Sequence, residues 1–347
     1  MQFLENYSLK HLNTFGIDVS AKYFSAFDTV AALQECLEIH SHLTSNPVTP
    51  DLQQSMLVLG GGSNVLFSGD YNGLVLKNEI TGIEKVSEDA DHIYLRAGAG
   101  VNWHEFVLNC IDNNYAGAEN LSLIPGSVGA SPMQNIGAYG VEVKDIFHEL
   151  EAYSIDDKKE VTFSKSDCAF GYRESVFKNK YKGKFIITSV TYRLDKIPVF
   201  NTSYGAIEAE LLKSGIHELS LRSISDAVIS IRRSKLPDPS MIGNAGSFFK
   251  NPVVTNLQFE ILKAAFPLIV GYPVNEKETK LAAGWLIEQC GWKGYRKGDA
   301  GCHEKQALVL VNYGNAKGEE ILHLSEKIIN SVKLMFDVEL QKEVNIL

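Results

Sequence analysis

Three polar segments of this chain contain residues that could take part in chemistry. Arg173 lies among aromatic residues in 170–178, where its guanidinium could hold a carboxylate through two hydrogen bonds. Ser247 lies in the glycine-containing segment 243–252, so a flexible turn could present its hydroxyl to a ligand. Glu343 belongs to the last residues of the chain. Each has an ordinary structural alternative: an ion pair for the arginine, a turn or cap for the serine, and a solvated acid for the glutamate.

Two glycine-rich loops follow predicted strands and could hold an anion. The first covers residues 59–67 and the second covers 124–140. Glycine lets the backbone approach a ligand closely and adopt positive φ, and successive exposed N–H groups then form an anion-binding nest. Such nests would suit a diphosphate in a protein of negative net charge. An ordinary turn is the alternative, because neither loop continues into the Gly-Lys-Ser/Thr of a P-loop or completes a Rossmann motif.

Histidine and cysteine spacing gives no metal site. The nine histidines include no HxxxH or HExxH pair. Cys302 and His303 are adjacent, but without a third identifiable group they are a poor candidate for a nucleophile pair. The five cysteines form no CxxC pair, which is typical of reduced thiols in a cytoplasm.

The composition disfavours several classes of protein. The chain has 347 residues, 45% of them hydrophobic, and a formal net charge of −9. General binders of nucleic acid or of anionic membranes are usually basic, so neither partner is expected. No apolar run approaches the roughly 20 residues that span a bilayer, and the N-terminus lacks the apolar core of a signal peptide. We expect a monomer, although no feature of the sequence decides the oligomeric state.

Hydrophobic periodicity predicts the helices that must position these residues. The four long helices, each given by its first or capping residue and its buried face, are Asp28 with Val30, Leu33 and Leu37; Asn102 with Trp103, Phe106, Val107, Cys110 and Ile111; Ser223 with Ile224, Ala227, Val228 and Ile231; and Glu319 with Ile321, Leu324, Ile328, Val332 and Met335. A shorter helix is predicted over 281–290. Arg232, Arg233 and Lys235 crowd the end of the third helix, where cations suit the helix dipole.

The strands complete a mixed fold. Short buried strands are predicted over 56–59, 73–77, 92–97 and 307–312. The region 147–194 is mostly β, and its alternation places Ile186, Val190, Tyr192 and Leu194 on one side of a strand. Helices and strands interleave without the regular βαβ rhythm of a doubly wound sheet. We therefore predict an α+β fold with a break near 235–240, and a loop at 45–54.

Taken together, the segments of this chain resemble one family, bacterial UDP-N-acetylenolpyruvoylglucosamine reductase, also called UDP-N-acetylmuramate dehydrogenase. The matching stretches are 13–17, 60–67, 123–141, 170–178, 235–239, 243–252, 280–289 and 306–312. Any one of them is weak, but all of them occur in the family's order and together they cover nearly the whole chain. Tyr204, within 201–205, resembles the substrate-gripping tyrosine of the family's first subtype.

The resemblance implies a fold and an activity. It implies a vanillyl-alcohol-oxidase (PCMH)-type FAD-binding domain over 17–197, followed by an α/β substrate-binding domain over 236–337. The FAD domain would have two lobes, with about 1–80 joined by 338–347. It further implies non-covalent FAD, NADPH, and reduction of UDP-N-acetyl-enolpyruvoylglucosamine to UDP-N-acetylmuramate. That reaction is a committed step of peptidoglycan precursor synthesis in a bacterial cytoplasm.

The resemblance also implies roles for individual residues. The implied catalytic residues are Arg173, Ser247 and Glu343. FAD would be held by Gly60, Gly61, Gly62, Ser63, Asn64, Gly126, Ser127, Gly129, Ala130, Ser131, Asn135, Gly137 and Tyr139. Substrate would be held by Tyr172, Tyr204, Lys235 and Asn251.

The implied chemistry suits those residue types. Reduced flavin would give hydride to C3 of the enolpyruvyl group, and Ser247 would give a proton to C2. Arg173 and Glu343 would stabilise the negative charge that spreads into the substrate carboxylate. General acid catalysis of this kind is typically worth about 10²–10⁴-fold.

One residue departs from the family, and two other functions stay open. Members commonly carry an arginine two residues after the terminal glutamate, where this chain has Asn345; Arg296 or Lys293 could substitute for it. A related FAD oxidase is one alternative, although its usual His or Cys tether to flavin is absent from 60–64 and 126–140. A nucleotide-sugar-binding module without catalysis is the other.

Overall fold

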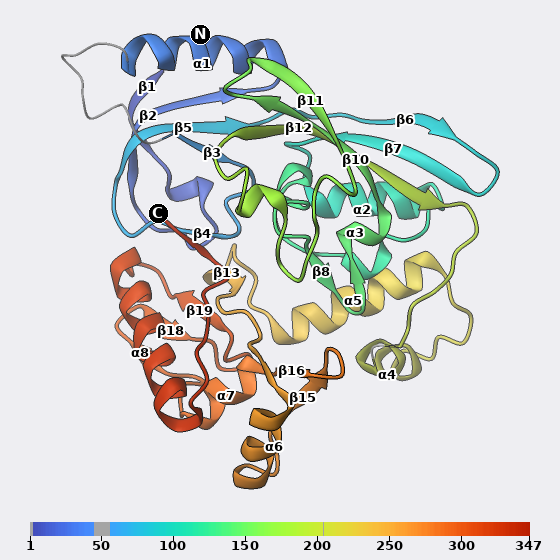
Figure 1. Ribbon diagram of the computed structural model, residues 1–347, viewed down its shortest axis with the longest axis vertical. Coiled ribbons are helices and arrows are strands. Elements are labelled where there is room, and N and C mark those ends of the chain that lie inside the picture. The colour runs from blue at the N-terminus through green and yellow to red at the C-terminus, as the bar shows by residue number, and fades with distance from the viewer. Residues whose placement is uncertain (1–2, 45–55, 204) are drawn as a thin grey trace. The chain divides into compact units, whose positions relative to one another are not determined.

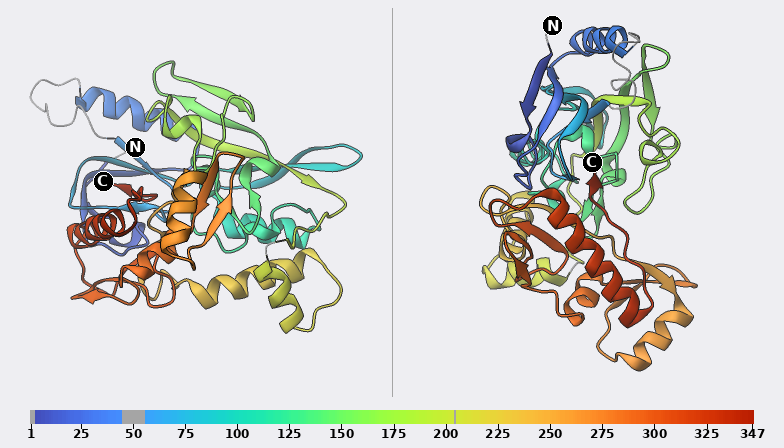
Figure 2. Two further views of the ribbon diagram at one scale, coloured as in Figure 1. Left: turned by 60° about the horizontal axis from the view of Figure 1, so that its bottom comes forward. Right: turned by 90° about the vertical axis from the view of Figure 1, so that its left-hand side faces the viewer.

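The structure is a computed structural model that describes residues 3–44, 56–203 and 205–347 (Figures 1 and 2). The predicted loop at 45–54 and Tyr204 lie outside the described residues. The chain forms two compact units. The first contains Met1–Tyr7, Ala21–Gly61 and Asn72–Ser234, and the second contains Ser8–Ser20, Gly62–Tyr71 and Lys235–Leu347.

The first unit is built mainly on two sheets. The four-stranded sheet has the order β1 (Leu4–Ser8), β2 (Ser20–Phe27), β5 (Tyr71–Asn78) and β3 (Met56–Leu59). The five-stranded sheet has the order β11 (Lys159–Ser164), β10 (Phe147–Ser154), β12 (Phe185–Asp195), β7 (His92–Gly98) and β6 (Ile83–Glu88). A short ladder pairs β8 (Gly137–Ala138) with β9 (Val141–Glu142). The helices are α1 (Val30–Thr44), α2 (Trp103–Asp112), α3 (Val143–Ile146), α4 (Gly205–Lys213) and α5 (Leu221–Lys235).

Two helices cover these sheets much as the periodicity predicts. The α1 helix lies over the four-stranded sheet in Figure 1, and its Leu33 packs with Leu74 and Leu76 of β5. The α2 helix buries all five residues predicted for its inner face, and the Asn102 side chain accepts hydrogen bonds from two amides of its first turn. The buried faces of α1 and α2 are therefore the ones that hydrophobic periodicity predicts.

Two helix caps lie at other residues than predicted. The Thr29 hydroxyl, not Asp28, accepts a hydrogen bond from Ala32 N at 3.1 Å. At α5 the cap is Ser220: its hydroxyl accepts from Ser223 N at 3.1 Å, and the Ser223 hydroxyl accepts from Ser220 N at 2.9 Å. Reciprocal bonding of this kind is a capping box, so the serine predicted as the cap occupies the third helical position instead.

The prediction that Ile186 shares one side of β12 with Val190, Tyr192 and Leu194 is wrong. The register of β10 against β12 shifts where Ile187 and Ser189 meet consecutive residues of β10, which leaves Thr188 as an extra residue. An extra residue reverses which face the following side chains occupy. Ile186 consequently joins the core beneath α1, while the other three pack in the core around α2.

The second unit is a smaller mixed domain. Its four-stranded sheet has the order β13 (Gly243–Ser247), β19 (Val309–Asn312), β18 (Ala300–Cys302) and β17 (Arg296–Lys297). Its three-stranded sheet has the order β14 (Val253–Thr255), β16 (Glu278–Leu281) and β15 (Gly271–Pro273). A parallel pair joins β4 (Val65–Leu66) and β20 (Asn345–Ile346). The helices are α6 (Asn256–Ala265), α7 (Ala283–Gln289) and α8 (Gly318–Phe336).

The buried face of α8 ends one residue later than predicted. Ile321, Leu324, Ile328 and Val332 are buried as expected, but Met335 is 47% exposed and Phe336 fills the last core position. Aromatic stacking of Phe336 on Phe266 and Trp285 explains the choice. Figure 2 shows α8 running along the sheet of this unit.

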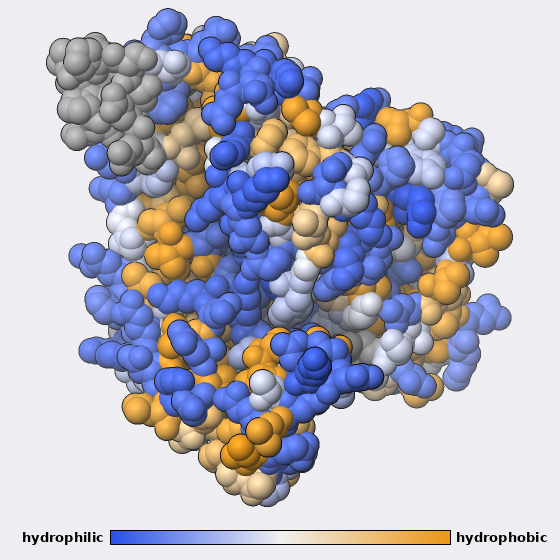
Figure 3. All heavy atoms as spheres, viewed as in Figure 1, coloured by the Kyte–Doolittle hydropathy of each residue, from blue (hydrophilic) through white to orange (hydrophobic). Residues whose placement is uncertain are grey.

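The surface of the described residues carries scattered apolar groups. On α6 and in the turn directly after it, Leu257, Ile261 and Leu268 are the most exposed apolar residues, and orange spheres gather at the bottom of Figure 3. Exposed apolar residues are ordinary on soluble proteins, and none of the predicted site residues is among these three. Among the described helices, none is long and apolar enough to cross a membrane.

Candidate active site

The two predicted glycine loops touch each other in the first unit. A Cβ on Gly60 would lie 2.5 Å from the Ser127 hydroxyl oxygen, and a Cβ on Gly61 would lie 2.7 Å from Gly126 Cα. A Cβ on Gly60 would displace only the Ser127 side chain, whereas a Cβ on Gly61 would meet backbone, so glycine at position 61 is what lets the two backbones meet. Loops more than sixty residues apart in sequence thereby form one surface.

Only part of this surface offers free amides. In the described residues, the N–H groups of Gly61, Gly126 and Ser127 donate no hydrogen bond. The amides of Val128 and Gly129 donate to Val101 and Ala99 at 2.8 and 2.9 Å.

The next two amides of the second loop are also used within the protein. The amide of Ala130 donates to Ser127 O, and that of Ser131 donates to Val128 O, both at 3.0 Å. The Ser131 hydroxyl bonds the buried hydroxyl of Tyr192 at 2.7 Å. The prediction of successive free amides is therefore wrong at residues 128–131, whose amides are used by residues 99–101 and by the 3₁₀ turn η4 (Val128–Ala130).

A lysine that the sequence analysis missed supports the first loop. The Lys77 amine, on β5, donates to the Gly60 carbonyl. Burial lowers the pKa of Lys77, and Glu79 acts in the opposite direction. A weak signal for this role was present, since Lys77 is a lone lysine directly after Leu74, Val75 and Leu76 in a buried strand.

Arg173 stands at the tip of a tight turn in the first unit. Gly171 and Glu174 exchange two backbone hydrogen bonds, and Arg173 between them has φ of 55°. Its guanidinium donates to the Gly137 carbonyl at 3.0 Å and lies 5.7 Å from the Tyr172 ring. The turn aims the cation at the loop that also carries the predicted flavin-side residue Tyr139.

Asn135 holds this turn in place. Its Nδ2 donates to the Gly171 carbonyl at 3.1 Å and to a Glu142 carboxylate oxygen at 2.9 Å. Its Oδ1 accepts from Lys144 N at 3.0 Å. Because the side chain is fully buried and bonded within the protein, the structure gives Asn135 a supporting position behind Arg173.

A second arginine faces the same cluster. Burial lowers the pKa of Arg232, with a further lowering from the charge of Arg173 and an opposing effect of Tyr139. Its Nε donates to the Leu123 carbonyl at 3.2 Å. The helix dipole was the expected reason for a cation at this end of α5, and the structure adds that Arg232 is turned inward to a backbone carbonyl of the first unit. Two guanidinium groups that repel each other create a site that favours an anion.

His104 clamps the other side of Leu123. Its Nδ1 accepts from Leu123 N at 3.0 Å, at a residue with φ of 58° just before the second glycine loop. Burial, followed by the charges of Arg233 and Arg232, lowers the pKa of His104 from its ordinary value. The ring must be neutral at Nδ1 to accept this bond.

We expect the stability of the protein to fall with pH in part through His104. A group whose pKa is lower in the folded chain stabilises it above the unfolded pKa, here 6.5, and that contribution is lost as the pH falls below it. Urea unfolding between pH 7.5 and 5.5 should give a shallower loss for His104→Asn, by at most about 1.4 kcal/mol per pH unit because one proton is involved. The exposed His217→Asn is the control; equal slopes for both variants would contradict the prediction.

Ser247 and Glu343 are neighbours in the second unit. The amide of Glu343 donates to the Phe248 carbonyl at 2.8 Å, which places the glutamate beside the residue that follows the serine. Phe248 and Phe249 are fully buried and meet edge to face, so they fix the backbone on one side of Ser247. Ser247 and Glu343 are both half-buried. The Ser247 hydroxyl makes no hydrogen bond to another described residue and is free to act on a ligand.

The end of the first glycine loop belongs to this second unit. Asn64 Nδ2 donates to the Glu343 carbonyl at 3.4 Å, and the Asn64 carbonyl accepts from both the amide and the side chain of Asn345. Asn345 therefore ties the terminal segment to the loop. The two suggested substitutes for a family arginine are engaged elsewhere, since Arg296 pairs with Asp299 and Lys293 pairs with Glu288.

The remaining predicted residues occupy varied positions. Gly62 has φ of 63° and packs against the Leu12 carbonyl. Asn251 accepts a hydrogen bond from Ala283 N at 3.0 Å, which holds the start of α7. Lys235 is exposed at the end of α5. A cavity of about 300 Å³ beside α8 includes none of the predicted site residues, so it does not mark the candidate site.

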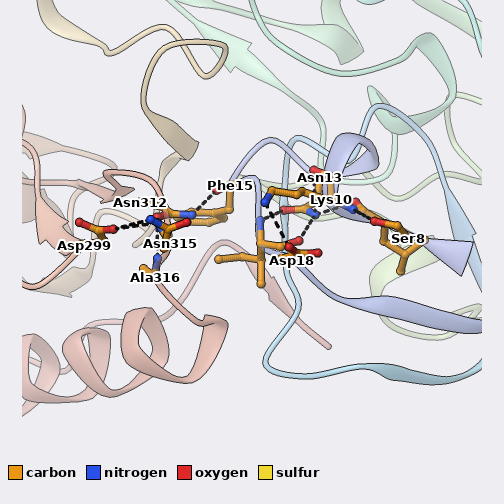
Figure 4. Close-up of polar contacts among 11 residues, drawn as sticks. Ser8, Lys10, Asn13, Phe15, Asp18, Asp299, Asn312, Asn315 and Ala316 are labelled. Atoms are coloured by element: carbon orange, nitrogen blue, oxygen red, sulfur yellow. Dashed lines mark hydrogen bonds and ion pairs between the residues drawn. The ribbon is translucent and has the colours of Figure 1, made fainter. Parts of the chain in front are cut away.

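The segment 13–17 braces the strand that carries Ser247. The carbonyl of Phe15 accepts from Asn312 Nδ2 at 2.9 Å, and the Asn312 Oδ1 accepts from two amides of the following turn (Figure 4). The Thr14 carbonyl accepts from Asn244 N at 2.9 Å. The Asn13 side chain in turn bonds the backbone of Leu9 and Ile17, so hydrogen bonds hold this segment at both of its ends.

Comparison with known proteins gives two family matches. Residues 238–347 match the C-terminal domain of UDP-N-acetylenolpyruvoylglucosamine reductase. Residues 48–162 match an FAD binding domain. Within the described residues, no disulfide joins any of Cys36, Cys110, Cys168, Cys290 and Cys302, and no group of acidic, His or Cys side chains could hold a metal ion.

Full-length relatives carry the same name. A UDP-N-acetylenolpyruvoylglucosamine reductase of Flavobacterium johnsoniae is 49% identical, with 100% of both chains covered. The reductase of Amoebophilus asiaticus is also 49% identical, again with 100% of both chains covered. A crystal structure of the Thermus caldophilus reductase superposes with a TM-score of 0.65 over 100% of this chain and 99% of that chain, at 21% identity. These matches confirm the predicted α+β fold with an FAD-binding domain.

Proposed function

Because the chain belongs to the UDP-N-acetylenolpyruvoylglucosamine reductase family, we propose that it reduces UDP-N-acetyl-enolpyruvoylglucosamine to UDP-N-acetylmuramate with NADPH. The chain is an FAD-dependent oxidoreductase of peptidoglycan precursor synthesis. The observation that carries the finer proposal is the backbone bond that sets Glu343 beside the Phe248 of the Ser247 strand. This bond supports the proposal that Ser247 and Glu343 act together on one substrate.

The paired glycine loops fit the diphosphate of FAD. Free amides at Gly61, Gly126 and Ser127 are the donors that a diphosphate needs, and the close contact of Gly61 with Gly126 leaves no side chain in the way. When bound there, FAD would supply the hydride, taken from NADPH, that is added to C3 of the enolpyruvyl group. We propose that the FAD-binding domain spans 17–197, with about 1–80 and 338–347 in one lobe, and that 236–337 bind the substrate.

Residues of this chain would stabilise the negative charge on the substrate and supply the proton to C2. Arg173 would hold the substrate carboxylate, and Glu343, in its protonated form, would donate a further hydrogen bond to it. The neighbouring charge of Arg232 supports an anion at this cluster. Ser247 would donate its proton to C2; a hydroxyl is a weak acid, but a positioned group can protonate a carbanion-like centre. Tyr172, Lys235, Asn251 and Tyr204 would contact the remainder of the substrate or NADPH.

An anaerobic titration tests this function. Purified protein should be yellow, lose its flavin absorbance when NADPH is added, and regain it when UDP-N-acetyl-enolpyruvoylglucosamine follows. Failure of the second step would reject the proposed substrate. Flavin colour that stays with the denatured protein would favour an oxidase with tethered FAD, and colourless protein would favour a binding module.

Replacement of Gly61 by alanine should weaken FAD binding. The added Cβ would meet the backbone of Gly126 at 2.7 Å and push the loops apart. Overpacking of this kind costs about 1–3 kcal/mol, which corresponds to a loss of affinity of about 5- to 150-fold if the whole cost falls on the FAD-bound form. The measurement is fluorescence titration of the apoprotein with FAD. Gly69→Ala is the matched control, because a Cβ there meets nothing within 4 Å; equal FAD affinity of both variants would contradict the prediction.

A further inference from the structure

The strand that carries Ser247 is irregular directly before the serine. In the pairing of β13 with β19, Asn244 lies opposite Val311 and Ser247 lies opposite Val309. Two residues of β13 therefore face one residue of β19, which is a β-bulge. A bulge re-aims the side chain that follows it. The direction of the Ser247 hydroxyl thus depends on the geometry of residues 245–246.

One buried side chain fixes that geometry. Asn244 Oδ1 accepts from the Gly246 amide at 2.9 Å, an Asx turn that spans the bulge. Asn244 Nδ2 donates to the Ile242 carbonyl at 2.8 Å and to the Pro237 carbonyl at 3.2 Å. Only 2% of Asn244 is exposed. Gly246 has φ of 68°, a conformation that glycine adopts more readily than other residues.

The backbone of Asn244 is braced as well. Its amide donates to the Thr14 carbonyl, and the Thr14 amide donates to the Gly62 carbonyl at 3.0 Å. Gly243 packs so closely on the Phe15 carbonyl that a Cβ would lie 2.1 Å from it. The segment 13–17 therefore holds the strand before the bulge, as the buried Phe248 holds it after Ser247. The Asn244 side chain is what fixes the bulge between these two anchors.

We propose that Asn244 is a positioning residue for proton transfer by Ser247, acting through the Asx turn at Gly246. This inference rests on the function proposed above. Without the side-chain amide of Asn244, the Gly246 N–H loses its acceptor. Residues 245–246 can then change conformation between the segment 13–17 contacts and Phe248. A misplacement of about 1 Å is enough to lower a rate by roughly 10²-fold.

Stopped-flow measurement of the two half-reactions tests the proposal. For Asn244→Ala, reduction of the bound flavin by NADPH should proceed at the wild-type rate. Reoxidation by the enolpyruvyl substrate should slow by roughly 10²-fold. Asn244→Ser should recover part of the loss, because a serine hydroxyl makes the same turn more weakly. The solvent deuterium isotope effect on reoxidation should be larger in Asn244→Ala than in wild type, since proton transfer then limits the step.

Asn312→Ala is the matched control. Asn312 is also buried and bonds the segment 13–17, but it makes no hydrogen bond to the bulge. Its loss should lower the melting temperature without separating the two half-reactions. Equal slowing of both half-reactions in Asn244→Ala, or slowing of neither, would overturn the proposal. If Asn244→Ala does not fold, Asn244→Ser decides by the same criterion, and a wild type that is not reoxidised would instead reject the proposed function.

Discussion

Replacement of Ser247 by alanine should abolish most turnover while leaving the protein able to accept electrons. Loss of a general acid typically lowers a rate by about 10²–10⁴-fold, and we expect the reoxidation of flavin by the enolpyruvyl substrate to fall in that range. Flavin reduction by NADPH needs no proton from this hydroxyl, so it should continue at the wild-type rate. Anaerobic stopped-flow absorbance separates the two steps in one experiment.

The fold should tolerate this change. Ser247 is half-buried, its hydroxyl bonds no other described residue, and the strand is held by Phe248, Phe249 and Asn244. Ser325→Ala is a suitable control, since it removes a fully buried hydroxyl of α8 that donates to the Leu322 carbonyl. That control should lose some stability and no reactivity. A Ser247→Ala variant with full turnover would remove the hydroxyl from the mechanism.

Hydrophobic periodicity correctly predicted the helices that bury one continuous apolar face. The α2 helix is the clearest case, because Asn102 and its five buried residues all lie within one short segment and need no distant partner. The cap of α5 was misplaced for the same local reason: two serines three residues apart both fit, and only the reciprocal bonds distinguish them.

Features that depend on contacts between distant parts of the chain could not be predicted from hydrophobic periodicity. The bulge at Thr188 depends on how β10 pairs with β12, so the side of Ile186 was predicted wrongly. The three cations at the end of α5 look alike in sequence, yet only Arg232 meets the Leu123 carbonyl. Which residue faces a site is settled by the tertiary path of a helix, not by its composition.

The glycine loops illustrate both outcomes. Their composition indicated close approach of backbone to a ligand, and the structure adds that Gly60 and Gly61 first approach the second loop itself. The extent of the amide nest was overestimated, because hydrogen bonds from Val128 and Gly129 to the 99–101 segment have no signal in the sequence of the loop. The supporting roles of Asn135 and Asn244 could not be recognised from the sequence either, since most of their hydrogen-bond partners are backbone groups.

Replacement of Arg173 should give the second largest effect on turnover. Arg173→Met removes the cation that we propose holds the substrate carboxylate while charge develops on it. Loss of one such donor typically costs about 10²–10³-fold in kcat, and reoxidation by the enolpyruvyl substrate should slow accordingly. Arg173→Lys should recover only part of this loss, because a lysine ammonium cannot form the two parallel hydrogen bonds of a guanidinium. Flavin reduction by NADPH should be much less affected than reoxidation.

The Arg173 turn is suited to this test because its backbone is held mainly by other residues. The backbone of the turn is held by Gly171 and Asn135, so both replacements keep those hydrogen bonds, and Arg173→Met additionally loses the bond from the guanidinium to the Gly137 carbonyl. Arg222→Met is the matched control in the same unit, because it removes a guanidinium that pairs with Asp112 at the surface and is 48% exposed. Surface pairs of this kind contribute little, so turnover should be unchanged. If Arg173→Lys reoxidised as fast as wild type, bidentate recognition of the carboxylate by this residue would be excluded, and the neighbouring Arg232 would become the group to replace next.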